Sequence, residues 1–284
     1  MTPLRQTMID AMQQRGFAVR TQQTYLAAVK DLARYFHRSP DQLTPDEIHA
    51  YFRYLALERH LSGASCHLYL NAIHFLYLQV LHWSEFPVDI VIPKRAQRIP
   101  ELLTRKEIAQ IILACTNPKH KMLLTLCYGC GLRVSEVVEV QIKQIDGERA
   151  LLHVEQGKGG KDRVVIIAPS LLKQLREYWQ QFRTPIWLFP HAQDYQRHIS
   201  ISAAQRIFCK AKQLSGVEKI GGIHSLRHAY ATHQLEQGLP IHQLQKLLGH
   251  GNVRSTMRYL HWVPNAQNDN HYADLIASLE VGHG

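Results

Sequence analysis

Apolar residues recur at helical spacing along the first part of the chain. In the segment TYLAAVKDLARYF, the side chains of Tyr25, Leu26, Val29 and Leu32 fall on one side of a helix. The segment CHLYLNAIHFLYLQVL is richer in apolar residues, and this pattern predicts a helix that is buried. The first part of the chain is therefore expected to be entirely helical.

A helix start lies between these two segments. Thr44 can cap a helix, Pro45 suits its first turn, and Glu47 can return a hydrogen bond to the backbone of Thr44 in a capping box. Apolar residues then continue at helical spacing as far as Leu55. Together these patterns predict a small bundle of three or four helices.

The second part of the chain combines helices with one pair of strands. A second capping box, from Thr104 to Glu107, precedes helical patterns over 105–116 and 119–130. Apolar runs then predict strands at 150–155 and 163–168, because the glycines of QGKGGKD between them suit a tight reversal.

The pattern becomes helical again after residue 170. Leu239-Pro240 is expected to start a helix that Gly249 ends. The predicted fold class is therefore mainly α with a small antiparallel β-sheet.

The length and the proline content of the chain predict two domains joined by a linker. A chain of 284 residues favours two domains over one core. The segment WSEFPVDIVIPKRAQRIP carries three prolines and a basic cluster, which predicts an extended connection. We expect a helical bundle at 1–82, a linker at 83–100, a larger mixed α/β domain at 101–276 and a tail at 277–284.

The excess of positive over negative charge is confined to the second part of the chain. Lys and Arg equal Asp and Glu in number over residues 1–93, so the whole formal excess of +10 lies in residues 94–284. Such a distribution favours binding to a polyanion, although a merely basic surface would produce it too. Beyond Tyr259 the chain has no Lys or Arg but keeps Asp269, Asp274 and Glu280, so this stretch better suits a protein contact.

Several classes of protein are disfavoured. No apolar run is long enough to span a bilayer, and the stretch MTPLRQTMIDAMQQRG lacks the apolar core of a signal peptide, so we expect a cytoplasmic protein without a membrane partner. Five cysteines argue against a disulfide framework. Cys127 and Cys130 end an apolar helical run and are interpreted as small buried residues rather than as a metal or redox site.

Four motifs carry candidate chemistry: GLRVSE at 131–136, GKGGKDR at 157–163, GGIHSLRHAYATH at 221–233 and LLGHGNVRSTMRYLH at 247–261. In the first, Arg133 would lie at the start of a helix, with Glu136 on the same face. In the second, Lys158 sits in a flexible glycine turn between strands, which excludes a Walker loop. Taken alone, the first motif is better explained as a surface Arg–Glu pair, and the alternative for the second is a solvated basic turn.

The last two motifs add histidines and a tyrosine. His224 and Arg227 share a face near a helix start, whereas His228 and His233 are weaker candidates that could equally fill the core. His250 follows the helix-ending Gly249. Asn252 can then cap a new helix that carries Tyr259 about two turns along.

The combined set suits attack on a phosphodiester. One planar guanidinium group can bind two phosphate oxygens at once. Lysine can protonate a leaving alkoxide, and histidine can move a proton to or from tyrosine. Tyrosine can hold a covalent intermediate, while arginines neutralise charge in the transition state.

In their order and spacing these motifs resemble the tyrosine site-specific recombinase, or phage integrase, family. The length is similar to Xer-like and short mobile-element recombinases, and the first domain resembles the helical core-binding domain of the family. This resemblance implies a catalytic set of Arg133, Lys158, His224, Arg227, His250 and Tyr259.

The resemblance also implies a role for each member of the set. The two arginines would clamp the scissile phosphate, with His250 bonded to one of its oxygens. Lys158 would protonate the leaving 5′-oxygen, His224 would take the tyrosine proton, and Tyr259 would form a 3′-phosphotyrosyl bond. Glu136 would support the site.

The implied function is site-specific DNA recombination, for integration and excision of a mobile element or for resolution of replicon dimers. Neither a metal, ATP nor another cofactor is expected. The implied partners are double-stranded DNA with specific recombination sites, held in a clamp formed by the two domains, and further copies of the chain in a tetramer on DNA. The alternatives are a type IB topoisomerase-like enzyme and a DNA-binding protein that has lost catalysis; the filled catalytic positions disfavour the latter.

Overall fold

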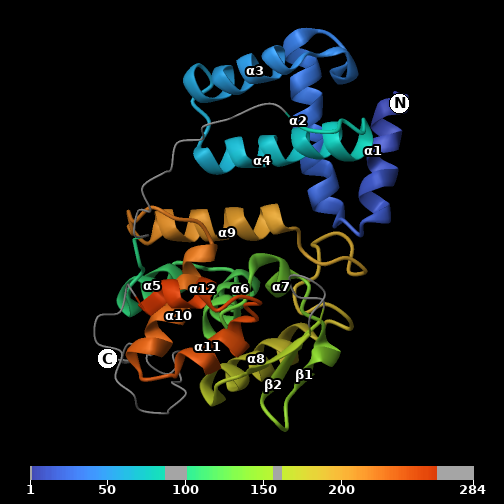
Figure 1. Ribbon diagram of the computed structural model, residues 1–284. Helices are drawn as coiled ribbons and strands as arrows, with labels where there is room; N and C mark the ends of the chain where they lie inside the picture. Colours follow the sequence, from blue (N-terminus) through green and yellow to red (C-terminus); the bar gives the residue numbers. More distant parts are fainter. Residues whose placement is uncertain (1, 87–100, 156–161, 261–284) are drawn as a thin grey trace. The chain divides into compact units, whose positions relative to one another are not determined.

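The computed structural model describes residues 2–86, 101–155 and 162–260. The chain forms two units, Met1–Arg98 and Ile99–Gly284, and each is considered by itself (Figure 1). The described part is mainly helical with one small antiparallel sheet, which confirms the predicted fold class. Most of the predicted linker, and the tail at 277–284, lie outside the described residues, so the predicted domain bounds stay a prediction.

The first unit is a bundle of helices, as predicted. Their bounds are α1 Pro3–Gln14, α2 Val19–Phe36, α3 Pro45–Leu57 and α4 Gly63–Phe75, with a π-helical turn at Leu76–Val80. The capping box predicted at the start of α3 is present: the Thr44 hydroxyl accepts from the backbone N–H of Glu47, and the Glu47 carboxylate accepts from that of Thr44. The core contains the fully buried Leu32, Ile48 and Ile73.

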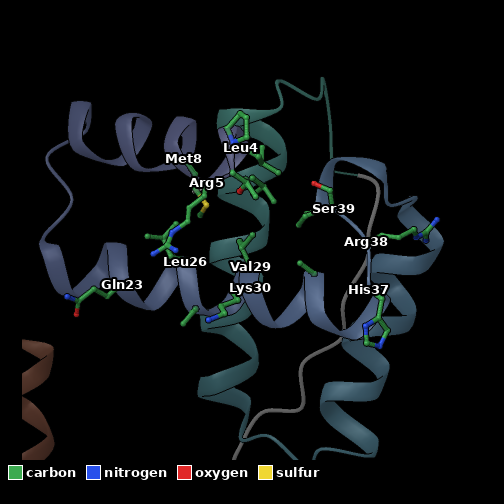
Figure 2. Close-up of a pocket in the computed structure, with 16 residues that line it drawn as sticks. Leu4, Arg5, Met8, Gln23, Leu26, Val29, Lys30, His37, Arg38 and Ser39 are labelled. Carbon is green, nitrogen blue, oxygen red and sulfur yellow. The ribbon is translucent and has the colours of Figure 1, made fainter.

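A hollow of about 1110 Å³ opens on the first unit, lined by α1, α2 and the turn after α2 (Figure 2). Its lining combines apolar side chains such as Leu4, Leu26 and Val29 with the basic side chains of Arg5 and Lys30. None of the candidate catalytic residues belongs to this lining.

The second unit carries the remaining elements. Its helices are α5 Arg105–Leu113, α6 Pro118–Gly129, α7 Val134–Val138, α8 Pro169–Phe182, α9 Ile201–Leu214, α10 His224–Glu236, α11 Ile241–Leu248 and α12 Arg254–Leu260. Thr104 and Glu107 form the second predicted capping box at the start of α5. Helix α6 is buried on all sides from Met122 to Gly129, so it can serve as the central helix around which its neighbours pack.

The sheet contains the predicted hairpin and one further short strand. Strand β2, Leu151–Val154, pairs antiparallel with β3, Arg163–Ile166, and β1, Ile145–Asp146, adds to the other edge of β2. Leu152 faces Val165 across the hairpin and both are buried, which is the period of two expected for a half-buried sheet. The hairpin turn at 156–161 lies outside the described residues.

Gly131 directs the chain from α6 into α7. Its φ of +59° lies in the left-handed region, and a Cβ atom there would lie 2.4 Å from the Cδ1 atom of Tyr230. A residue with a side chain would therefore suffer both backbone strain and a clash with a buried ring. This turn delivers Arg133 to the start of α7.

Within the described residues, no helix is both long enough and apolar enough to cross a bilayer.

A pair of glycine substitutions tests this packing. Gly216→Ala places a side chain at a φ of +72° with no atom within 4 Å of the new Cβ, so it should cost only the backbone strain of about 1–2 kcal/mol. Gly131→Ala should cost a further ~1–3 kcal/mol because the Tyr230 ring must move. Denaturant unfolding of both variants measures the difference, and equal losses would contradict the proposed clash.

Candidate active site

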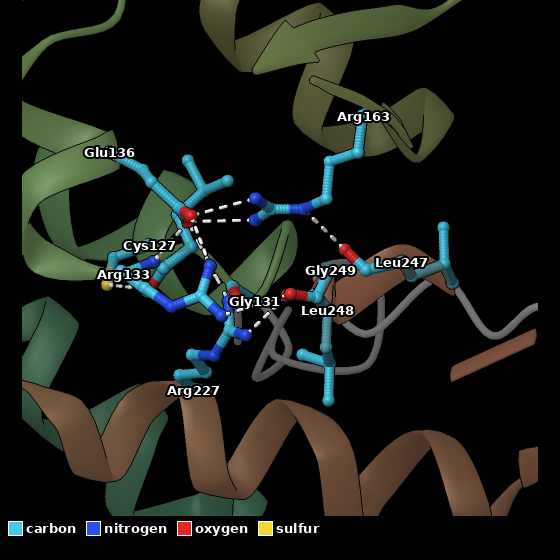
Figure 3. Close-up of polar contacts among 10 residues, drawn as sticks. Cys127, Gly131, Arg133, Glu136, Arg163, Arg227, Leu247, Leu248 and Gly249 are labelled. Carbon is cyan, nitrogen blue, oxygen red and sulfur yellow. Dashed lines mark hydrogen bonds and ion pairs between the residues drawn. The ribbon is translucent and has the colours of Figure 1, made fainter. Parts of the chain in front are cut away.

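The carboxylate of Glu136 is buried among three guanidinium groups (Figure 3). Arg163 binds it with two parallel hydrogen bonds, at 2.7 Å and 2.8 Å. Arg133 donates to it from its backbone N–H at 2.7 Å and from its side chain at 2.6 Å, and a side-chain nitrogen of Arg227 lies 3.7 Å from it. One acidic side chain therefore gathers arginines from α7, β3 and α10.

The same three arginines also meet the C-terminal end of α11 (Figure 3). Arg163 donates to the carbonyl of Leu247 at 2.8 Å, and Arg227 donates to that of Leu248 at 2.5 Å. Arg133 donates to the carbonyl of Gly249 at 3.3 Å. The last carbonyls of a helix lack partners within it and carry partial negative charge, so the guanidinium groups satisfy them.

Gly249 permits this close approach. It ends α11 in the left-handed conformation, with a φ of +61°, as the sequence predicts. A Cβ atom at this position would lie 2.8 Å from the Cδ atom of Arg163. The glycine therefore serves the helix end and the arginine cluster at once.

The cluster keeps its ions charged. Burial alone would raise the pKa of Glu136, but the hydrogen bonds and charge of Arg163, the backbone N–H of Arg133 and the charge of Arg227 hold this pKa at about 2. Burial and the neighbouring charge of Arg133 lower the pKa of Arg227 to about 10, which still leaves it protonated at pH 7. Three positive groups around one carboxylate leave an excess of positive charge that favours an anionic ligand.

Tyr259 lies close to this cluster, on α12. Its side chain is 4% exposed, and its hydroxyl oxygen is 3.0 Å from Nδ1 of His228 on α10. Burial raises the pKa of Tyr259, although the charges of Arg227 and Arg133 act in the opposite direction. The hydroxyl is therefore protonated at neutral pH.

His228 and His250 lie against the tyrosine, and His224 lies against His228. His250 lies with its ring parallel to that of Tyr259 at a centroid distance of 6.3 Å, and its Nδ1 is 2.8 Å from the Thr256 hydroxyl. His224 is exposed at the start of α10, and its ring meets that of His228 edge to face.

These histidines are neutral at pH 7. Burial and the charges of Arg227 and Arg133 lower the pKa of His250 to about 4. Burial and the charges of His224 and Arg227 lower that of His228 to about 4, and the pKa of His224 is lowered by desolvation of its ring and by the same two arginines. Each can therefore exchange a proton with a neighbour in response to a change in local charge.

Five of the six residues predicted from the sequence lie in the described part of the chain. Arg133 and Arg227 meet at Glu136 and at the end of α11, while His250 and Tyr259 have stacked rings. Lys158 lies outside the described residues, so the structure adds nothing to its prediction.

The sequence motifs did not single out two residues of this region. The motifs assign no role to Arg163, which closes the hairpin motif GKGGKDR, and they give His228 only as a weaker candidate. The only sequence signal for His228 is its spacing of one helical turn from His224.

The remaining side chains considered in the sequence are structural. His233 bonds to the Tyr128 hydroxyl at 2.9 Å within the core. Cys127 and Cys130 are buried, and burial raises the pKa of both thiols to about 12. This confirms their interpretation as packing residues.

Comparisons with known proteins identify the family. Residues 101–265 match the phage integrase family, and residues 4–85 match the N-terminal SAM-like domain of phage integrases. The protein y4qK of Sinorhizobium fredii, which is described as an integrase/recombinase, is 40% identical over 93% of this chain and 86% of its own length. The chain belongs to the phage integrase family.

Other members of this phage integrase family agree in sequence and fold. The tyrosine recombinase XerA of Pyrococcus horikoshii is 34% identical over 59% of this chain and 59% of its own length. A crystal structure of a lambda integrase dimer bound to a COC′ core site has a TM-score of 0.73 over 87% of this chain and 90% of that chain, at 20% identity, and shares the fold. This phage integrase family member is thus a tyrosine recombinase, an enzyme of site-specific DNA recombination.

Glu136→Gln tests the importance of the buried carboxylate. The pKa of Glu136 in the folded state, about 2, lies below its ordinary value of 4.5, so its charge stabilises the fold above about pH 4.5. The variant should lose on the order of 3 kcal/mol of unfolding free energy at pH 7. The gap from the parent should shrink as the pH falls toward 2.

Denaturant unfolding over a series of pH values measures this gap. Glu139→Gln provides the control, because Glu139 is exposed at the end of the same helix and its removal should change stability by less than about 0.5 kcal/mol. A gap for Glu136→Gln that stays constant with pH would show that its charge is not what stabilises the cluster.

Proposed function

We propose that this site cleaves and rejoins DNA strands through a covalent bond between Tyr259 and a 3′-phosphate. The observation that carries the proposal is the placement of a buried tyrosine hydroxyl beside α10: it contacts His228, which directly follows Arg227, and Arg227 meets Arg133 at Glu136. A phosphodiester needs its charge neutralised during displacement, and paired guanidinium groups supply that without a metal ion.

The contacts of Arg227 and Arg133 position both side chains to bind an anion. The donors of Arg227 contact backbone carbonyls, and its side chain is 1% exposed, so it is rigidly placed. The side chain of Arg133 is 18% exposed and makes a longer bond of 3.3 Å to Gly249. We infer that Arg133 exchanges this carbonyl for a phosphate oxygen while Arg227 supplies a fixed charge from beneath.

His250 completes the clamp in this proposal. Its Nδ1 faces the Thr256 hydroxyl, which can donate to it and so place the ring hydrogen on Nε2. The Nε2–H group would then donate to a second phosphate oxygen. Lys158, in the hairpin turn, would protonate the leaving 5′-oxygen.

The substrate we propose is double-stranded DNA with specific recombination sites. The basic excess of residues 94–284 supports binding to a polyanion. A further solved structure of the same fold is a lambda integrase tetramer bound to a Holliday junction, which supports assembly of four copies on DNA here. In such a complex the two domains would close around the duplex, and the acidic stretch beyond Tyr259 would contact a neighbouring copy.

We propose a role in mobile-element integration and excision or in replicon dimer resolution, within the cytoplasm where the DNA lies. Relatives described as integrase/recombinase support the first role, and those described as XerA support the second. Sequencing the DNA trapped covalently on the protein in its native host identifies the site and so separates the two.

Tyr259→Phe tests the nucleophile. The variant should bind DNA like the parent but form no covalent adduct on a nicked suicide substrate, because it lacks the attacking oxygen. Denaturing gel electrophoresis detects the adduct. Tyr195→Phe is the control, since Tyr195 is 59% exposed and should leave adduct formation unchanged. An adduct with Tyr259→Phe would refute the assignment.

Lys158→Ala tests the general acid. Cleavage of an ordinary substrate should slow by about 100-fold or more, because the leaving oxygen receives no proton. A substrate with a bridging sulfur at the 5′ position should largely restore the single-turnover rate, since sulfur leaves without protonation. Lys161→Ala is the matched control within the same turn; if it alone shows this pattern, Lys161 is the acid.

A further inference from the structure

The Tyr259 hydroxyl contacts a histidine to which the family motifs assign no role. Its oxygen lies 3.0 Å from Nδ1 of His228, and the two ring centroids are 5.7 Å apart. The motifs instead give the tyrosine proton to His224, which lies one turn earlier on α10 and meets the His228 ring at a centroid distance of 4.7 Å. The structure thus offers two histidines for one proton.

The contact with His228 is sheltered from water and suits proton transfer. Tyr259 is buried and His228 is half-buried, whereas His224 is exposed. Tyr259 keeps its proton at pH 7 because burial raises its pKa, and His228 is neutral because its pKa is about 4. A neutral imidazole with its hydrogen on Nε2 presents the Nδ1 lone pair, to which the tyrosine O–H then donates.

His250 is poorly placed to compete for this proton. Its ring plane lies only 9° from that of Tyr259, in a parallel arrangement, and its Nδ1 is engaged with the Thr256 hydroxyl. Proton transfer needs a ring nitrogen aimed at the hydroxyl, within about 2.6–3.2 Å of its oxygen. His228 meets that requirement in the described structure.

We propose that His228, rather than His224, takes the proton of Tyr259 during strand cleavage. This inference rests on the proposed function. As the Tyr259 oxygen attacks, its bond to phosphorus forms and the bond from phosphorus to the 5′-oxygen breaks. The hydroxyl proton passes to Nδ1 of His228, and the 5′-oxygen receives a proton from the general acid. Rejoining reverses each transfer.

Phosphate binding favours this transfer. Burial, the adjacent His224 and the positive charge of Arg227 all disfavour a protonated His228. A phosphodiester held by the arginines brings a negative charge that offsets Arg227, so His228 becomes a stronger base when substrate is present. The tyrosine is thereby activated only when a phosphate is in place.

Three variants of the full-length protein separate the roles: His228→Ala, His228→Asn and His224→Ala. The side-chain oxygen of asparagine can accept a hydrogen bond from Tyr259 but cannot take its proton. We expect both His228 variants to bind DNA like the parent and to form the covalent adduct about 100-fold more slowly or worse in single-turnover assays. His224→Ala should be affected less.

Added imidazoles supply the decisive readout. Imidazole should partly restore adduct formation by His228→Ala, and the restored rate should rise with the pKa of substituted imidazoles of similar size. A residue that only positions the tyrosine would respond to the size of the added ring but not to its basicity. Thermal unfolding checks that each variant is folded, and His228→Gln replaces His228→Ala if the latter is not.

Each outcome decides the question. Cleavage by His228→Asn at the parent rate would reduce His228 to a positioning residue and overturn the proposal. If the rate restored by added imidazoles rises with their pKa in His224→Ala but not in His228→Ala, then His224 is the residue that takes the proton. The behaviour of the parent protein distinguishes failure of this inference from failure of the proposed function. If the parent forms no adduct at Tyr259, the proposed function is refuted. If the His228 variants form the adduct as fast as the parent, only this inference is refuted.

Discussion

The buried carboxylate of Glu136 is the interaction on which the site depends. It holds Arg133, Arg163 and Arg227, which come from segments far apart in the chain, and each of these arginines also satisfies one carbonyl at the end of α11. An unpaired buried charge is very costly, so no member of this cluster can leave without penalising the others. The cluster therefore fixes α7, β3, α10 and α11 relative to one another and keeps a positive surplus for an anion.

Close packing of the backbone makes this arrangement possible. Gly131 passes beneath the ring of Tyr230, and Gly249 passes against the aliphatic part of Arg163, at distances that leave no room for a Cβ atom. Both glycines also need the left-handed conformation that reverses the chain after a helix. At each of these two positions, one glycine allows both the turn of the chain and the close approach of a side chain.

The cluster also sets the proton chemistry near Tyr259. Burial and the charge of Arg227 lower the pKa of both His228 and His250, while burial keeps the tyrosine protonated. The Tyr259 hydroxyl consequently keeps its proton, and the arginines proposed to bind a phosphate also help to keep the neighbouring histidines neutral. For a tyrosine recombinase, the proposed coupling between phosphate binding and activation of Tyr259 would limit cleavage to DNA that is correctly bound.

Local signals allowed much of this protein to be predicted from its sequence. The capping boxes at Thr44 and Thr104, the strand pair and the helix end at Gly249 each depend on a few neighbouring residues, and the structure confirms them. The order of the motifs also predicted the family correctly. Only the tertiary structure revealed that Arg163 binds Glu136 and that His228 contacts Tyr259, because these partners lie 27 and 31 residues apart. Neither contact follows from helical or strand periodicity; each arises only when packed helices and strands bring distant side chains together.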